Sequence, residues 1–235
     1  MRTSRITLAI GFAVPFFSFL QLKRTVLAVF FMTLLVLLPL NAKGSELITI
    51  NTFLPWKTLD KILQVSVIKE TPLSPDQILS VKKAITGFGT VKYDDTLRYV
   101  SWQEALKTTS EYKTKIFMPT IEIVADNNKE ADLTITITDS KNADGSSGYT
   151  THVVEDNVIV KSNITIYDIN NMSGKQISSI TRHEFGHALG LGHSDSPEDL
   201  MYEIIQVASY VTDCDVDTLL TLYDGNVKSV SQCGI

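Results

Sequence analysis

Three of the four histidines in this 235-residue chain stand close together, at His183, His187 and His193. His183 and His187 are four positions apart, so on a helix both imidazoles lie on one face and can reach the same metal ion. Gly190 can adopt a positive φ, which lets the chain leave the helix and bring His193 in as a third nitrogen ligand. Three neutral imidazoles with one open position are typical of a catalytic zinc site. The segment therefore predicts one zinc ion, held by these three histidines.

Glu184 is the carboxylate of the same segment. It follows His183 directly, so it can contact a water on the metal without being a ligand itself. Such a carboxylate can take a proton from the attacking water and return it to a leaving amine. The pattern H-E-x-x-H-x-x-G-x-x-H therefore predicts a zinc-dependent endopeptidase with Glu184 as general base. The alternative is a non-catalytic metal-holding binding module, which would need the histidines but not the carboxylate.

A methionine follows this segment after a turn rich in Asp, Ser and Pro. Together with the zinc motif, Ser194 and the triplet Leu200-Met201-Tyr202 resemble the metzincin peptidases, and within them the matrixin branch, the matrix metalloproteinase-like catalytic domains. Residues 131–137, 148–154 and 213–225 also resemble strands and the final helix of that family. The resemblance implies that Met201 packs beneath the zinc and that residues 202–212 form the wall of the primary specificity pocket.

The resemblance also implies the fold and the partners. It implies an α+β catalytic domain with a twisted mixed β-sheet, an active-site helix, a second long helix and a C-terminal helix. The periodicity agrees with this class: it predicts strands at 62–68, 97–100, 120–125, 133–138 and 158–167 and helices at 75–86 and 175–189, and leaves 102–107 undecided. The expected partner is a protein or peptide substrate, lying extended beside an edge strand.

One departure from the family concerns metal content. Matrixins usually hold a second, structural zinc with three histidines and an aspartate. His152 stands at one such position, but Ile166 occupies the place where the next histidine would be expected, and the chain has no further histidine. We therefore expect one zinc rather than two, with His152 a surface or half-buried strand residue.

A loop at residues 139–148 is a candidate calcium site. Asp139, Asn142 and Asp144 supply the hard oxygen ligands that Ca²⁺ prefers, and Asp168 is a further candidate from the resemblance. A solvated turn explains the same residues, so both interpretations stay open.

Residues 1–42 differ from the rest of the chain. Arg2 and Arg5 precede an apolar run at 6–20, and a second run at 25–40 ends in small residues, which is the pattern of a secretory signal. The second run is shorter than the about 20 residues of a spanning helix, and an uncleaved signal anchor is the alternative. We predict a signal peptide or anchor at 1–42 and one zinc peptidase domain at 43–235, either secreted or membrane-anchored and facing outside.

The charge and the cysteine content bear on the partner and the cellular compartment of the protein. The formal charge is −5, and removing residues 1–42, which hold four basic residues and no acid, makes it −9. An acidic exported domain argues against nucleic acid or an anionic membrane as the main partner. The two cysteines, Cys214 and Cys233, suggest one disulfide between the last helix and the C-terminal tail if the protein is exported; two free thiols are the alternative.

Overall fold

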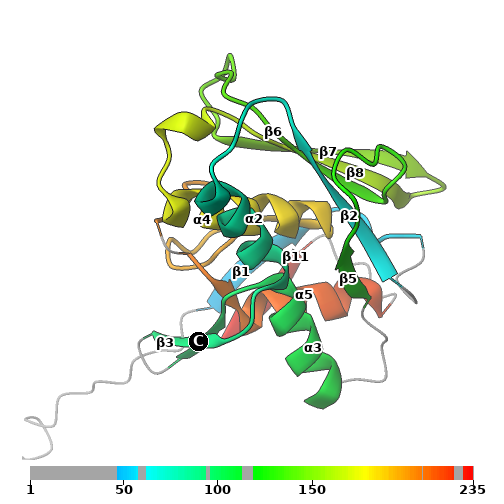
Figure 1. The fold of residues 1–235 in the computed structure, drawn as a ribbon. Helices are drawn as coiled ribbons and strands as arrows, with labels where there is room; N and C mark the ends of the chain where they lie inside the picture. Colours follow the sequence, from blue (N-terminus) through cyan, green and yellow to red (C-terminus); the bar gives the residue numbers. More distant parts are fainter. Residues whose placement is uncertain are drawn as a thin grey trace, which may run out of the picture. The chain divides into compact units, whose positions relative to one another are not determined.

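The structure is a computed structural model that describes residues 47–57, 62–93, 96–112, 119–207, 209–224 and 230–234 (Figure 1). The basic and apolar segment at 1–42 lies outside these residues, so the signal peptide or anchor stays a prediction. No helix in the described ranges combines the length and the apolar character needed to cross a membrane.

The main sheet has five strands in the order β5-β2-β6-β8-β7. Four of them run parallel: β5 (Thr120–Ile123), β2 (Ile62–Lys69), β6 (Leu133–Ile137) and β8 (Val158–Ile166). The fifth, β7 (Gly148–Glu155), is antiparallel to β8 and forms the edge. The central strand β6 is almost wholly buried, whereas β7 alternates between half-buried and exposed positions in its first half, as expected of an edge strand covered on one face. The sheet is therefore mixed, as predicted.

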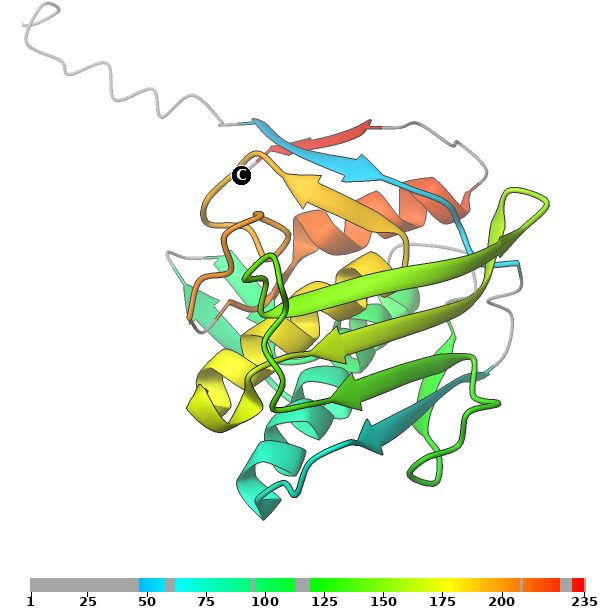
Figure 2. The ribbon, with the colours of Figure 1, turned by 90° about the horizontal axis from the view of Figure 1, so that it is seen from above.

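Two helices, α2 (Pro75–Thr86) and α4 (Gly174–Ala188), pack side by side on one face of this sheet (Figure 2). Each begins with a capping box, in which a serine and a glutamine three residues later satisfy each other's backbone N–H groups; the serines are Ser74 and Ser173. α4 is preceded by a short 3₁₀ helix, Ile169–Asn171. α2 has the predicted bounds, and α4 begins and ends one residue earlier than predicted, a difference that is usual at helix ends.

The segment that the sequence left undecided is a helix, α3 (Trp102–Tyr112). Ser101 Oγ accepts a hydrogen bond from the backbone N–H of Glu104 at 3.1 Å, which caps the first turn. Trp102 is fully buried, and its Nε1 donates to the carbonyl oxygen of Arg182 at 2.7 Å. The Ser-x-x-Glu spacing before an apolar run was a usable signal for this helix.

Two small sheets complete the domain. One has the order β11-β1-β9 and contains β11 (Val230–Gly234), β1 (Leu47–Thr52) and β9 (Leu191–Ser194); the other has the order β10-β4-β3 and contains β10 (Val211–Thr212), β4 (Thr96–Tyr99) and β3 (Thr90–Tyr93). The residue pattern did not predict β1, β3, β9, β10 or β11. These strands are short, and nearly the whole domain separates β1 from its partner β11 in sequence.

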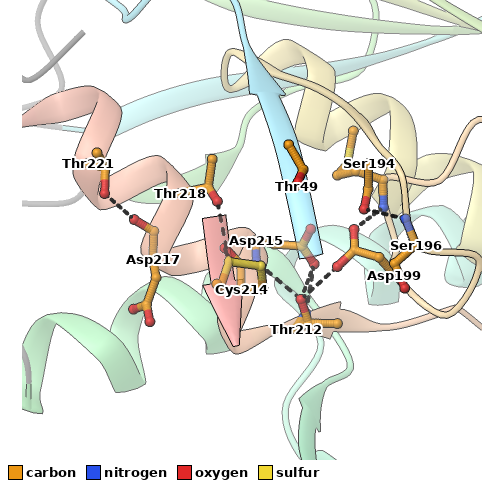
Figure 3. Close-up of a disulfide and its surroundings, with 12 residues drawn as sticks. Thr49, Ser194, Ser196, Asp199, Thr212, Cys214, Asp215, Asp217, Thr218 and Thr221 are labelled. Atoms are coloured by element: carbon orange, nitrogen blue, oxygen red, sulfur yellow. Dashed lines mark hydrogen bonds between the residues drawn. A yellow bond between two sulfur atoms is a disulfide. The ribbon is translucent and has the colours of Figure 1, made fainter. Parts of the chain in front are cut away.

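The final helix, α5 (Asp213–Tyr223), is joined to β11 by a disulfide between Cys214 and Cys233, whose Cα atoms are 5.7 Å apart (Figure 3). This confirms the predicted pairing of the last helix with the C-terminal tail.

Candidate metal centre

His183 and His187 project from the same face of α4. His183 Nδ1 lies 2.8 Å from the carbonyl oxygen of Leu200, and His187 Nδ1 lies 2.9 Å from that of Leu191. A carbonyl oxygen can only accept a hydrogen bond, so each Nδ1 carries the ring proton. Each Nε2 is then left with a free lone pair, the tautomer required of a metal-binding imidazole.

The two Nε2 atoms face each other at 3.0 Å. With both Nδ1 atoms protonated, a hydrogen bond between them would need one ring to be an imidazolium. Burial opposes this: it lowers the pKa of His183 to about 4 and that of His187 to about 3. Two lone pairs at this distance fit a shared cation, because tetrahedral zinc–nitrogen bonds of 2.0–2.1 Å would place two such nitrogens about 3.3 Å apart.

His193 joins them from β9. Ligand atoms of the three histidines all lie within 4.8 Å of one another, and this is the one such group of His, Cys, Asp or Glu that the described part of the chain contains. Gly190 makes the turn with φ of 104°, and a Cβ there would lie 2.5 Å from the carbonyl oxygen of Leu54. A glycine is therefore required at this position for conformation and for space.

Strand β1 holds the segment that carries His193. Phe53 donates its backbone N–H to the Gly190 carbonyl oxygen at 2.8 Å. Thr49 donates its N–H to Asp195 Oδ1 at 2.8 Å, and Asp195 returns a backbone N–H to the Thr49 carbonyl oxygen at 3.1 Å. The third histidine is thus positioned by residues from the other end of the domain.

Glu184 lies beside the three rings with only 4% of its surface exposed. Burial raises the pKa of its carboxyl to about 7, although a hydrogen bond from the hydroxyl of Thr150 opposes the shift. A carboxylate whose pKa lies near neutral pH is suited to accept and return a proton.

Met201 is fully buried beneath α4. A Cβ added at Gly186 would lie 2.4 Å from Met201 Sδ, so this glycine lets the helix rest directly on the thioether. The preceding residue, Leu200, supplies the carbonyl oxygen that orients His183. The turn therefore packs against the helix that carries His183 and His187, and the position of Met201 beneath a zinc ion stays a prediction.

A cavity of about 770 Å³ opens over the three histidines and Glu184. Its other walls come from residues 144–150, which lead into β7, from the N-terminal half of α4 and from residues 203–207. The last stretch lies within the predicted pocket wall at 202–212. Apolar side chains stand exposed around the cavity: Phe53, Tyr149, Ile204 and Val207.

His152 is half-buried, as predicted, and lines the same cavity. Its Nδ1 lies 2.8 Å from Ser162 Oγ, and Ile166, at the position where the family has another histidine, is fully buried in the core. His152 thus has a hydrogen-bond partner in Ser162 and is not part of the histidine group that could hold a metal ion.

The candidate calcium residues take part in local hydrogen bonds. Asp144 Oδ1 accepts from the backbone N–H of Ser146 at 2.9 Å, and Asn142 Nδ2 donates to Ser146 Oγ at 2.6 Å. Asp168 Oδ1 accepts from Asn171 Nδ2 at 2.6 Å. These bonds account for the turn, and calcium stays a prediction.

Two buried polar groups around the site were not found from the sequence. Arg182, next to His183, donates from Nε to the Val100 carbonyl oxygen at 2.7 Å and from Nη1 to that of Ser209 at 2.6 Å. Its guanidinium also lies 4.7 Å from the centre of the Tyr210 ring. Arg182 therefore fastens the end of the pocket wall to α4. A charged residue just before the first histidine of the motif was the available signal.

The second group is a pair of buried carboxyls, Asp199 and Asp215 (Figure 3). Asp199 Oδ1 accepts from the N–H of Met201 at 2.8 Å, and the hydroxyl of Thr212 contacts Asp199 Oδ2 at 3.3 Å and Asp215 Oδ2 at 2.9 Å. Burial raises the pKa of both, and that of Asp215 also rises because of the neighbouring Asp199. The pair joins α5 to the methionine turn.

Two comparisons with known proteins point to the same family. The family model for matrixin matches residues 88–224, which include the whole histidine segment and the methionine turn. The probable matrix metalloproteinase 095L of Invertebrate iridescent virus 3 is 53% identical over 38 residues, which cover 16% of this chain and 10% of that protein. The match thus spans a tenth of the length of this relative.

Proposed function

The chain belongs to the matrixin family, and from this premise we propose that it is an exported zinc-dependent endopeptidase. His183, His187 and His193 would hold the zinc, and Glu184 would act as general base. The observation that carries the proposal is the pair of Nε2 lone pairs facing each other at 3.0 Å beside a buried carboxylate whose pKa is raised to about 7.

The chemistry divides between metal and protein. When bound, zinc would acidify a water molecule and polarise the scissile carbonyl. Glu184 would take the proton of the attacking water and pass it to the leaving amine, so that no covalent bond to the protein is needed. The carbonyl groups of Leu200 and Leu191 would keep His183 and His187 in the tautomer that leaves Nε2 free.

The edge strand β7 supports an extended mode of substrate binding. One side of β7 is paired with β8, and no strand in the described sheet pairs with the other. A peptide could pair with this open edge through its backbone while a side chain enters the cavity bounded by residues 203–207. The expected partner is therefore a protein or peptide rather than nucleic acid.

Export is part of the proposal. The signal-like segment at 1–42 and the bond between Cys214 and Cys233 support an oxidising destination. Contact with a membrane would come only through that segment if it is retained. Fractionation of cells that make the full chain would test this, and full-length protein in the cytosol with both thiols free would contradict it.

A peptide-library digest of the purified protein, with and without a chelator, tests the activity. We expect cleavage that the chelator abolishes and that added zinc restores, with about one zinc per chain by elemental analysis. Two zinc ions per chain would contradict the single-site proposal. A protein that binds zinc tightly but cleaves no peptide would favour the non-catalytic binding module.

A further inference from the structure

The start of β7 faces the carboxylate of Glu184. Along this strand Gly148, Thr150 and His152 are half-buried, whereas Tyr149 and Thr151 between them are exposed. Because side chains alternate between the two faces of a strand, the half-buried set points toward α4. The first two of these residues contact Glu184, which lies on α4.

Thr150 makes a short hydrogen bond to the carboxylate. Its Oγ1 lies 2.6 Å from Glu184 Oε2 and 3.1 Å from the Glu184 backbone carbonyl oxygen. A hydroxyl has one proton to donate, and the shorter contact to the charged oxygen is the stronger one. In the described structure no other group donates a hydrogen bond to this carboxylate. Thr150 is therefore the side chain that fixes where Oε2 lies.

Gly148 provides the space for this arrangement. A Cβ at this position would lie 2.5 Å from Glu184 Oε1 and 2.6 Å from Glu184 Cγ. Any side chain at 148 would push the carboxylate out of its present position. One oxygen is thus held by Thr150, while the other borders a position that has no side chain.

We propose that Thr150 is a positioning residue for Glu184: its hydroxyl holds Oε2, so that Oε1 is left free to accept the proton of the attacking water. The proposal rests on the proposed function and deepens it. A carboxylate held in place before reaction does not have to be ordered during it, which is the general advantage of a preorganised site. Gly148 is the second part of the arrangement, because it lets β7 approach the carboxylate closely enough for this bond.

Kinetics of three variants of the zinc-loaded protein test the proposal. Thr150→Val keeps the shape and removes the hydroxyl; we expect kcat to fall about tenfold or more, the rate equivalent of a hydrogen bond to a charged group, while KM and zinc content stay unchanged. Thr150→Ser keeps the hydroxyl and should recover most of kcat. Gly148→Ala, which displaces the carboxylate but keeps the hydroxyl, should also lower kcat.

Thr165→Val is the matched control. Thr165 lies in β8, where the buried positions Ile164 and Ile166 on either side of it face the helices, so its own side chain is on the opposite face of the sheet. The same loss of a hydroxyl at this position should leave kcat, KM and zinc content unchanged.

Thermal unfolding of the metal-free protein gives a readout that does not depend on activity. We expect Thr150→Val to lower the melting temperature in the wild-type background and to have a clearly smaller effect in a Glu184→Ala background, because the bonded partner is already gone. This coupling would be seen even if the protein proved to have no peptidase activity. Failure of the proposed function and failure of this inference are therefore distinguishable.

Three outcomes would overturn the inference. The first is a Thr150→Val variant with the wild-type kcat. The second is a Thr150→Ser variant as slow as Thr150→Val, which would show that a hydroxyl at this position is not enough to maintain kcat. The third is an equal loss of melting temperature in both backgrounds, which would show that Thr150 acts without Glu184.

Discussion

The two halves of the metal centre are built in different ways. His183, Glu184 and His187 lie on one helix, where spacing alone places the two rings together, and His183 is only 2% exposed. His193 lies on the four-residue strand β9, is exposed, and is held by β1, with a contact between Thr49 and Asp195 that spans 146 positions. The helical half depends on local geometry, whereas the strand half depends on parts of the chain far away in sequence.

The strand half is held through a series of neighbouring elements. β9 pairs with β1, β1 pairs with β11, and β11 is joined to α5 by the disulfide between Cys214 and Cys233. Removing the disulfide or β11 should therefore displace His193 more than it displaces α4. The proposed zinc binding and the proposed proton transfer should therefore be weakened by different substitutions, since they depend on different parts of the fold.

The helical half should carry out the proton transfer of peptide hydrolysis. Glu184→Gln tests this and should have the largest effect. The amide cannot accept the proton of the attacking water, and loss of a general base typically costs about 10²- to 10⁴-fold in rate. Peptide cleavage and elemental analysis on the same sample should give little turnover with a full complement of zinc. Turnover close to that of the wild type would remove Glu184 from the proposed role.

The strand half should depend on the disulfide. Replacing Cys214 and Cys233 by serine opens a loop with a sequence separation of 19, and the chain-entropy model gives a loss of roughly 3 kcal/mol in the free energy of unfolding. Denaturant unfolding measures this loss. Hydrogen exchange should show faster exchange in β1 and β9 than in α4, and zinc should dissociate more readily.

Equal exchange rates in α4 and β9 of that double-serine variant would contradict the distinction between the two halves. The same measurement on wild-type protein before and after mild reduction serves as a control for effects of the serine side chains.

The buried carboxyl pair should respond to substitution in opposite ways. Asp199 Oδ1 accepts from the buried N–H of Met201, so Asp199→Ala would leave that donor without its partner and should lower the free energy of unfolding by about 2 kcal/mol. Burial and the neighbouring Asp199 raise the pKa of Asp215, and its Oδ1 is buried with no hydrogen-bond partner among the described residues, which disfavours the charged form. Asp215→Asn imitates the neutral form and should be tolerated.

The same pair predicts a pH dependence. A carboxyl whose pKa is higher in the folded than in the unfolded state contributes stability below its unfolded pKa of about 3.9, and this contribution is lost as pH rises through the folded value. Asp215→Asn should therefore have a flatter stability profile above pH 4 than the wild type. Unfolding curves at several pH values would show this, and an unchanged slope would argue that Asp215 is ionised in the fold.

Met201 should give the smallest effect. Leucine has a similar volume, so Met201→Leu should cost less than about 1.5 kcal/mol and leave zinc binding intact. Calorimetry and elemental analysis would check both. Release of zinc from a variant that remains folded would show that the thioether does more than pack against Gly186.

Much of this protein can be read from its sequence where the signal is local. The four-residue spacing of His183 and His187, the need for a glycine at 190 and the capping serines of α2 and α4 are properties of short segments. The strands of the main sheet were also recognisable, because β-branched residues recur in them with the alternation that one covered face requires. The cluster of His183, His187 and His193 and the helix that carries two of them were therefore predictable, and their role as zinc ligands stays a prediction.

The tertiary structure decided what depends on distant contacts. A strand such as β1 is too short to be distinctive until its partners β9 and β11 are known, and pairing partners are not encoded within a segment. The same holds for the hydroxyl of Thr150 beside Glu184 and for the carboxyl of Asp215 beside Asp199: each is an ordinary polar residue in sequence. Only the fold removes them from water and brings them within hydrogen-bond distance of the groups on which they act.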